Sequence, residues 1–326
     1  MSTIKDVAER AGVSVATVSR VLNKKGPISE KAIREVNKAV KELDYHPNII
    51  ARSLVSGKSR TIGVIMPALN NPFWSEIAQE LDKCAKEINY HIFFSITPEK
   101  TEDRLQAIDD LQNRQVCGIL YSGRWEEGIQ EKRTVPMVEM MGSHKELPAV
   151  ISDDETGGLL AARHLIAKGC KRLVHVSGDL NHYTTGDERT YSFMKECERR
   201  GVNCKLYQSK SWMGSSSEIE GMTDLVNKIY YENPDMDGVF LSNDILATMC
   251  VNYAMSQGMR IPDDIRIVGY DDISLGRLIY PPLTTIRQDY RQLCKKAITL
   301  LKDQVEGKEI EKLTKIPVKL IERKTT

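Results

Sequence analysis

Residues 3–23 read TIKDVAERAGVSVATVSRVLN, and this stretch predicts two short helices that meet at a single glycine. Thr3 can cap the first helix, and Asp6, three residues later, can reach back to it as in a capping box. Gly12 supplies a tight left-handed turn, and Ser14 can cap the second helix directly after it. Two helices joined in this way form a helix-turn-helix, although an ordinary helical hairpin shows the same bare pattern.

In a helix-turn-helix the second helix lies in the major groove of DNA, and its first residues meet the base edges. Val15 and Ala16 are small and apolar, so they can only contact thymine methyl groups or fill space. Arg20, one turn further, can donate two hydrogen bonds to a guanine, and the polar side chains around it suit phosphate or base contacts. The predicted DNA contacts of this stretch are Thr3, Ser14, Val15, Ala16, Thr17, Ser19, Arg20 and Asn23.

A third helix is predicted over EKAIREVNKAVKELDY at 30–45, because Ser29 can cap it and its apolar residues follow helical spacing. The residues expected to face the first two helices are Ala32, Ile33, Val36, Val40 and Leu43. Pro47 ends this part, and NIIARSL at 48–54 is a short helix-prone segment before the linker SGKSR at 56–60. Because a helix of about seven residues is marginal in water, the segment needs a partner to hold it.

Four stretches together resemble the LacI/GalR, or lactose-repressor, family of bacterial transcription regulators. They are IKDVAERAGVSVATVSRVLN at 4–23, ISEKAIREVNKAVKELDYHPNIIARSL at 28–54, PPLTTIRQ at 281–288 and KLIER at 319–323. The resemblance covers nearly the whole chain, and its motifs are specific in combination. It implies a helix-turn-helix headpiece at 1–46, a hinge helix and linker at 47–60, and an effector-binding and dimerisation domain at 61–326.

In the family that the chain resembles, the hinge folds on DNA, pairs with its twin from the other subunit and enters the minor groove at the centre of the operator. Leu54 matches the position that wedges between the central base pairs, as apolar side chains do in kinked minor grooves. The alternative is a surface leucine in a linker. The hinge contacts that the resemblance implies are Asn48, Ala51, Arg52 and Leu54.

Charge is distributed unevenly along the chain. The 326 residues carry a net charge of +1, but residues 1–60 hold twelve Lys/Arg against six Asp/Glu, a net charge of +6 that leaves −5 for the remainder. The basic end contains the helix-turn-helix, as binding to phosphates requires. The N-terminus has no apolar core of secretory length, and no apolar run approaches a membrane span, so we expect a cytoplasmic protein that joins the bacterial nucleoid when bound to DNA.

Nothing in the sequence indicates catalysis. The seven cysteines contain no CxxC pair, so we expect them to be reduced and expect neither a metal nor a cofactor. No GxGxxG follows a strand, no P-loop or GxSxG elbow is present, and the six histidines form no HExxH pair. We therefore do not expect an enzyme, and the missing signal peptide together with the basic headpiece excludes an exported sugar-binding protein.

From Thr61 onward apolar strands alternate with amphipathic helices. The predicted strands are TIGVIMP, HIFFSIT, GILYS, PMVEMM, AVIS, RLVHVSG, GVFLSN, RIVGYDD, LTTI and KIPVKLIER. This alternation predicts an α/β domain of doubly wound parallel sheets with helices on both faces, and the strands are too many for one such sheet. We expect two lobes like those of periplasmic binding proteins, an N-lobe of about 61–160 plus 289–326 and a C-lobe of about 161–288.

Ligands of open α/β sheets bind beyond the carboxyl ends of the strands, so the residues directly after each strand are the candidates for an effector site. A sugar needs aromatic faces for its ring and polar partners for its hydroxyls. Phe73 could stack on a sugar, and the resemblance implies that Arg189, Asp271, Gln288 and Trp212 contact the effector. The predicted effector contacts are Asn71, Phe73, Arg189, Trp212, Asn243, Asp271 and Gln288. For neighbouring Asp244, a helix cap is the favoured reading.

The sequence departs from the family pattern at two strand ends. Met141 and Gly142 stand where an aspartate and a polar residue are usual, and Ser152 stands where an aspartate is common. These changes remove two polar partners, so the pattern of hydroxyls that the site reads must differ from that of the better known family members. The aromatic residues of NNPFW and Trp212 favour a saccharide over a purine.

We interpret the chain as a homodimeric repressor that binds a pseudo-palindromic operator and is released from it by a sugar. The alternative within the family is a carbon-catabolite regulator that answers to a phosphorylated carrier protein. Such a regulator does not need a polar cleft, whereas the presence of both Arg189 and Asp271 favours one.

Replacing Arg20 by alanine tests the predicted base contact. Loss of a bidentate contact to guanine should cost about 1–3 kcal/mol of preference at one base pair, with sugar binding intact. Competitive binding to operator variants, measured at one salt concentration, checks this, and an unchanged base preference would remove the assignment.

Overall fold

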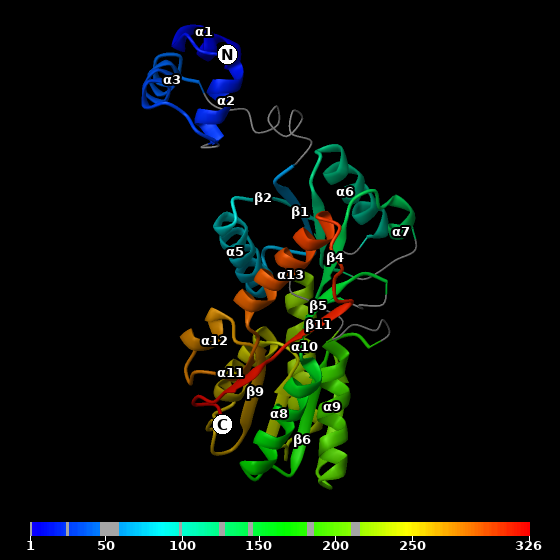
Figure 1. The fold of residues 1–326 in the computed structure, drawn as a ribbon. Helices are drawn as coiled ribbons and strands as arrows, with labels where there is room; N and C mark the ends of the chain where they lie inside the picture. Colours follow the sequence, from blue (N-terminus) through cyan, green and yellow to red (C-terminus); the bar gives the residue numbers. More distant parts are fainter. Residues whose placement is uncertain are drawn as a thin grey trace. The chain divides into compact units, whose positions relative to one another are not determined.

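The structure is a computed structural model, and it describes residues 2–23, 26–45, 59–97, 100–123, 128–142, 146–180, 186–209 and 216–326. The chain divides into two compact units, residues 1–59 and 60–326 (Figure 1). The predicted hinge contacts Asn48, Ala51, Arg52 and Leu54 and the predicted effector contact Trp212 lie outside the described residues, as does the side chain of Asn23.

The first unit is a three-helix headpiece of α1 (Ile4–Ala11), α2 (Val15–Asn23) and α3 (Glu30–Glu42). The predicted caps are confirmed: Thr3 Oγ1 accepts from the Asp6 backbone, the Thr3 backbone donates to Asp6, and Gly12 has a φ of 64°. Ser14 Oγ accepts from the backbone N–H of Thr17 at 3.2 Å, which starts α2 directly after the turn.

One apolar residue of each headpiece helix is fully buried, namely Val7, Val18 and Val36. Ile33, predicted to face the other helices, is instead 38% exposed, and Ala39 takes a core position at 2%. The prediction for Ile33 is wrong because it lies at the edge of the apolar stripe, whose centre passes through Val36 and Ala39.

The second unit contains two six-stranded sheets, which confirms the predicted two-lobed α/β fold. The N-lobe sheet has the order β11-β5-β4-β3-β1-β2, formed by β1 (Thr61–Met66), β2 (His91–Ile96), β3 (Gly118–Tyr121), β4 (Met137–Met140), β5 (Ala149–Ser152) and β11 (Leu313–Ile316). The C-lobe sheet has the order β12-β10-β9-β8-β6-β7, formed by β6 (Arg172–Ser177), β7 (Asn203–Gln208), β8 (Gly238–Leu241), β9 (Arg266–Asp271), β10 (Thr284–Arg287) and β12 (Lys319–Ile321).

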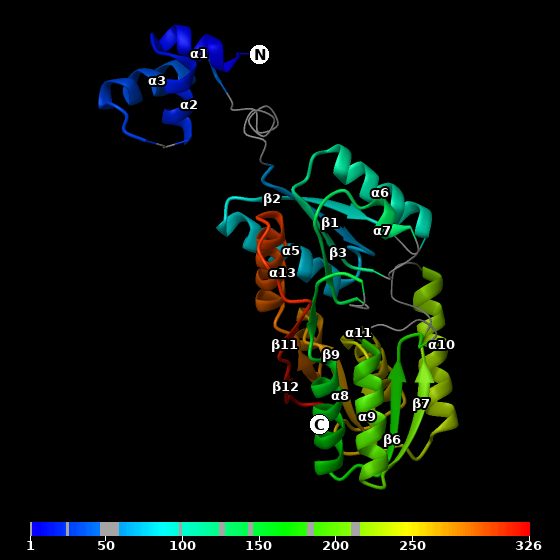
Figure 2. The same ribbon diagram turned by 45° about the vertical axis from the view of Figure 1, so that its right-hand side comes forward.

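Helices cover both faces of each sheet (Figures 1 and 2). In the N-lobe one face packs on α5 (Pro72–Glu87) and α13 (Tyr290–Val305), and the other on α6 (Thr101–Asn113) and α7 (Ile129–Lys132). In the C-lobe one face packs on α10 (Ser216–Glu232) and α11 (Asp244–Ser256), and the other on α8 (Asp154–Ala167) and α9 (Gly186–Arg199). Central strands such as β8 are buried on both sides, as expected for parallel sheets.

Two lobe boundaries differ from those predicted. The chain enters the C-lobe at Asp153, which caps α8, and not near residue 160, because the apolar residues of α8 pack in the C-lobe core. KIPVKLIER is not one strand: β11 joins the N-lobe sheet in parallel beside β5, whereas β12 joins the C-lobe sheet antiparallel to β10. Pro317 lies between them and has no N–H to continue a ladder, so the strand breaks there.

The described residues contain no helix that is both long enough and apolar enough to cross a membrane.

Gly158 on α8 is required by the close packing of α8 against α9. A Cβ at this position would lie 2.0 Å from the carbonyl oxygen of Arg189. Gly158→Ala should therefore destabilise the fold by about 1–3 kcal/mol through overpacking, although alanine in an open helix gains up to about 1 kcal/mol over glycine. Urea unfolding measures the change. Gly221→Ala on the exposed side of α10 is the matched control and should be neutral or stabilising; equal effects at both positions would contradict the packing argument.

Candidate functional site

The predicted DNA contacts of the headpiece lie mainly on its surface. Val15 is 41% exposed, Ala16 and Arg20 are exposed beside it on α2, and Thr3 and Ser14 are exposed next to the helix starts. Thr17 and Ser19 are half-buried, and the hydroxyl of Thr17 lies 2.9 Å from that of Ser14. The apolar side of α2 is occupied by the headpiece core, so its exposed side is the one that can meet DNA. The individual DNA contacts stay predictions.

In the C-lobe, Arg189 is held by a buried set of partners at the carboxyl end of the sheet. Its Nε and Nη2 donate to Asp154 Oδ1 at 3.1 and 2.7 Å, and its Nη1 donates to the carbonyl of Ser242 at 2.7 Å. The guanidinium carbon lies 3.6 Å from the ring centroid of Tyr270, whose hydroxyl donates to the same carboxylate at 2.6 Å. These bonds use three of the five N–H donors of an arginine.

The charges of this set depend on one another. Burial raises the pKa of Asp154, although Arg189 and Tyr270 both act to lower it. Burial acts to lower the pKa of Arg189, but the charges of Asp154, Tyr270 and Asp271 and the hydrogen bond to Asp154 together outweigh it, and the pKa is raised. The Arg189 side chain is 14% exposed. A largely covered cation with a carboxylate, a carbonyl and an aromatic face around it keeps its place, so the guanidinium is a rigid group at this edge.

Asp271 ends β9 and is 6% exposed. Its Oδ1 accepts from Gln288 Nε2 at 2.6 Å, and its backbone oxygen accepts from the hydroxyl of Tyr290 at 2.6 Å. Burial raises the pKa of Asp271 to about 7, while Arg189 and Gln288 act to lower it. Asp271 also has a φ of 110°, a strained backbone conformation of the kind that often accompanies function.

Gln288 connects Asp271 to the other lobe. It is 4% exposed, and while its amide nitrogen donates to Asp271, its oxygen accepts from the hydroxyl of Ser152 at the end of β5. Ser152, which stands where the family pattern has an aspartate, is therefore a structural partner of Gln288. The three side chains form a hydrogen-bonded path between the two sheets.

Phe73 lies at the start of α5 in the N-lobe. Its ring makes edge-to-face contacts with Trp74 and Tyr290, at centroid distances of 4.9 and 5.6 Å. Asn71 caps α5 by accepting from the backbone N–H of Phe73 at 3.0 Å, so its side-chain oxygen serves the helix start. The ring of Tyr290 contacts the ring of Phe73, and its hydroxyl donates to the backbone oxygen of Asp271. Tyr290 therefore links the two residues predicted to contact the effector.

Asp244 has another role than the predicted helix cap, whereas the effector contact of Asn243 stays a prediction. Asn243 is the cap of α11, because its oxygen accepts from the backbone N–H of Leu246 at 2.9 Å. Asp244 is not the cap: fully buried, it accepts from Thr285 Oγ1 at 2.6 Å and from the backbone of Ile273 at 3.0 Å. Burial raises the pKa of Asp244 well above its usual value.

Sequence reasoning missed Asp154 and Tyr270, which orient Arg189. Asp154 lies two residues after the end of β5, and Tyr270 is the residue of β9 before Asp271, so a search that included residues next to the strand ends could have found both. At the other departure from the family pattern, Met141 packs against the N-lobe core, and the carboxylate of fully buried Glu139 lies where a Cβ at Gly142 would stand. Glycine at 142 therefore makes room for Glu139.

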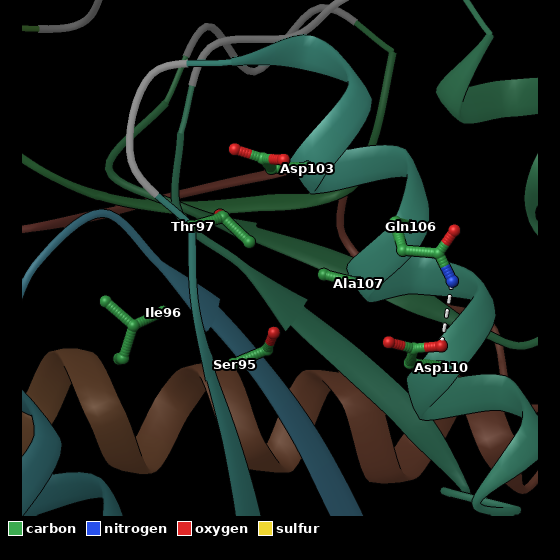
Figure 3. A pocket seen from close by; sticks show the side chains of 7 residues that line it. All are labelled: Ser95, Ile96, Thr97, Asp103, Gln106, Ala107 and Asp110. Atoms are coloured by element: carbon green, nitrogen blue, oxygen red, sulfur yellow. Dashed lines mark hydrogen bonds between the residues drawn. The ribbon is translucent and has the colours of Figure 1, made fainter.

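A surface cavity of about 210 Å³ lies in the N-lobe between the end of β2 and α6 (Figure 3). It is lined by Ser95, Ile96, Thr97, Asp103, Gln106, Ala107 and Asp110, and Gln106 donates to Asp110 at 2.9 Å along α6. None of the residues predicted to contact the effector lines this cavity. The candidate effector site is therefore the group of side chains around Arg189, Asp271 and Gln288, and not this cavity. Within the described part of the chain, no cluster of three or more His, Cys, Asp or Glu could hold a metal ion.

Comparison with known proteins gives matches along the chain. Residues 3–48 match the family described as bacterial regulatory proteins, lacI family, and residues 162–326 match the periplasmic binding protein-like domain. The chain is 34% identical over 329 residues to the ribose operon repressor of Halalkalibacterium halodurans, covering 100% of this chain and 97% of that protein.

Two further matches span both units. The HTH-type transcriptional repressor PurR of Haemophilus influenzae is 33% identical over 319 residues, covering 95% of this chain and 93% of that protein. The solved structure of the lac repressor dimer bound to operator and the anti-inducer ONPF has a TM-score of 0.88 at 26% identity, covering 99% of this chain and 98% of that one.

Asp271→Asn should stabilise the protein in a pH-dependent way. The folded pKa of about 7 lies above the ordinary value of 3.8, so ionisation of Asp271 destabilises the fold progressively as pH rises from about 4 to about 7. Asparagine removes this cost and still accepts from Gln288. The free energy of unfolding of the variant should exceed that of the unchanged protein only slightly near pH 4. The difference should grow to at most a few kcal/mol by pH 7 and then stay level, since one pKa unit corresponds to about 1.4 kcal/mol.

Urea unfolding at pH 5, 6, 7 and 8 measures this trend. Asp264→Asn is the matched control, because Asp264 is exposed and its side-chain hydrogen bond with Arg260 lowers its pKa to about 2. The variant should therefore lose the same small amount of stability at each of these pH values. A gain at Asp271 that does not change with pH would contradict the assigned pKa.

Proposed function

This chain belongs to the LacI family of bacterial regulatory proteins, and we propose that it represses a sugar-utilisation operon from which a sugar effector releases it. It is a sequence-specific DNA-binding regulator that acts by binding and not by catalysis. While it holds operator DNA it resides on the nucleoid.

The DNA-bound form is a homodimer, like the lac repressor dimer bound to operator. Two copies related by a two-fold axis place two headpieces on the half-sites of a pseudo-palindromic operator. In each headpiece Arg20 reads a base and the exposed hydroxyl residues near the helix starts hold phosphates. The hinge contacts Asn48, Ala51, Arg52 and Leu54 belong to the same proposal.

The effector is a sugar, and the observation that carries this is the position of Tyr290 between Phe73 and Asp271. A sugar ring needs an aromatic face and acceptors for its hydroxyls, and Phe73 and Asp271 supply them from opposite lobes. Arg189 has two further N–H donors beyond those bonded to Asp154 and Ser242, and Gln288, Asn243, Asn71 and Trp212 complete the proposed contacts. Similarity to a ribose operon repressor makes D-ribose the first sugar to test.

Release follows from differential affinity. The two lobes are joined by the path from Asp271 through Gln288 to Ser152, so a sugar held by both lobes favours one relative orientation of them. If that orientation keeps the two hinges from pairing on DNA, the sugar and the operator compete for the protein. The coupling is reciprocal, so operator DNA should weaken sugar binding by the same factor.

Fluorescence anisotropy with operator-length DNA, a palindrome with a central CG step, at fixed salt tests the proposal. D-ribose, or another member of a sugar panel, should lower operator affinity, and Asp271→Ala should abolish that response while operator affinity without sugar stays unchanged. Sugar binding to the variant should be about ten- to a hundredfold weaker, because a hydrogen bond to a charged group is lost.

Loss of both activities in Asp271→Ala would indicate a role in folding instead. If the protein binds DNA and no sugar changes its affinity, the sugar proposal is wrong, and a phosphorylated carrier protein becomes the effector to add to the same assay.

A further inference from the structure

Glu76 joins the two lobes next to Asp271. Its Oε1 accepts two hydrogen bonds from Ser274, one from the backbone N–H at 2.8 Å and one from the hydroxyl at 2.7 Å. Glu76 lies on α5, which packs on the N-lobe sheet, whereas Ser274 begins α12 (Ser274–Leu278), which follows β9 of the C-lobe. Hydrogen bonds of this kind are lost beyond about 3.5 Å, so a separation of the lobes by little more than 1 Å at this point would break both.

The segment that Glu76 holds has a strained backbone. Asp271 and Asp272 have φ values of 110° and 58°, conformations that residues with side chains rarely adopt. Such conformations persist only where the surroundings hold them. The two residues and Ser274 are separated only by Ile273, so whatever fixes Ser274 also limits the orientation of the Asp271 carboxylate.

Several contacts from within the C-lobe hold this segment. The backbone of Ile273 donates to Asp244 at 3.0 Å, and the carboxylate of Asp272 pairs with Arg287 at 2.5 Å and with Arg323. Glu76 differs from these contacts because it comes from the N-lobe. It is therefore placed to make the conformation of the segment depend on how the lobes are oriented.

We propose that Glu76 is a positioning residue of the effector site, which fixes the 271–274 segment through Ser274 and so presents Asp271 to the effector when the lobes are closed. The inference rests on the proposed function, because Asp271 is a proposed effector contact. A sugar bound by Asp271 then favours the orientation in which Glu76 reaches Ser274. Phe73, one helical turn before Glu76, moves with it, so the stacking ring and this contact approach the C-lobe together.

Hydrogen exchange in the full chain tests the contact without any effector. In Glu76→Ala the amides of the 271–276 segment should exchange about tenfold faster or more, because the Ser274 N–H loses a charged acceptor. Glu76→Gln should show a smaller change, since its oxygen can still accept both bonds without the charge. Unchanged exchange in Glu76→Ala would overturn the proposal.

Glu80→Ala is the matched control. Glu80 lies one turn further along α5 and bonds to Arg291 of α13 at 2.9 Å, a contact between two helices of the N-lobe. Removing it deletes the same charge from the same helix without touching the contact between lobes. Exchange of the 271–276 segment should therefore stay as in the unchanged protein, and equal acceleration in both variants would show a general effect of α5 instead.

Titration with D-ribose, followed by calorimetry, tests the positioning role. Glu76→Ala should weaken binding about tenfold, Ser274→Ala should weaken it less because its backbone N–H remains, and the double variant should bind no worse than Glu76→Ala alone. Additive losses would show that Glu76 does not act through Ser274. If the unchanged protein binds no sugar, the proposed function fails, while hydrogen exchange still decides whether Glu76 holds the segment.

Discussion

The structure of residues 60–326 depends on how two mainly parallel sheets meet at the carboxyl ends of their parallel strands. Polar groups buried at such a junction must find partners, because an unmade hydrogen bond there costs about 1–3 kcal/mol. Gln288 meets this requirement since an amide side chain both donates and accepts: it donates to Asp271 and accepts from Ser152. One neutral side chain thereby satisfies a carboxylate of one lobe and a hydroxyl of the other.

Around this junction both lobes contribute side chains to the proposed effector site. The side chain of Arg189 is 14% exposed, and its contacts with Asp154, Ser242 and Tyr270 fix its orientation. Phe73 and Glu76 lie on α5 and reach the C-lobe through Tyr290 and Ser274. In the proposed mechanism, a sugar bound at a site divided in this way favours one lobe orientation, and the paired headpieces respond to that orientation.

The sequence predicted helix caps and turns correctly, because each depends on residues that are close together in the chain. The capping box of Thr3 and Asp6, the turn at Gly12 and the cap at Ser14 all involve residues within four positions of each other, and all are confirmed. The positions of Asp271 and Gln288 at strand ends followed from the alternation of strands and helices and from resemblance to a family, and the role of Arg189, which lies on α9, followed from the resemblance. Ile33 was placed in the core wrongly because periodicity gives the direction of a stripe but not its width.

The sequence by itself determined the helix-turn-helix, the two-lobed α/β fold and the strand ends where polar side chains gather. These depend on spacing, capping and turn chemistry, which act over a few residues. Only the tertiary structure decided that Asn243 and not Asp244 caps α11, that β12 crosses to the C-lobe, and that Asp154 and Tyr270 hold Arg189. It also decided that Glu76 meets Ser274, 198 residues away. Such pairings depend on which elements pack together, and no pattern within a short window of the chain records that.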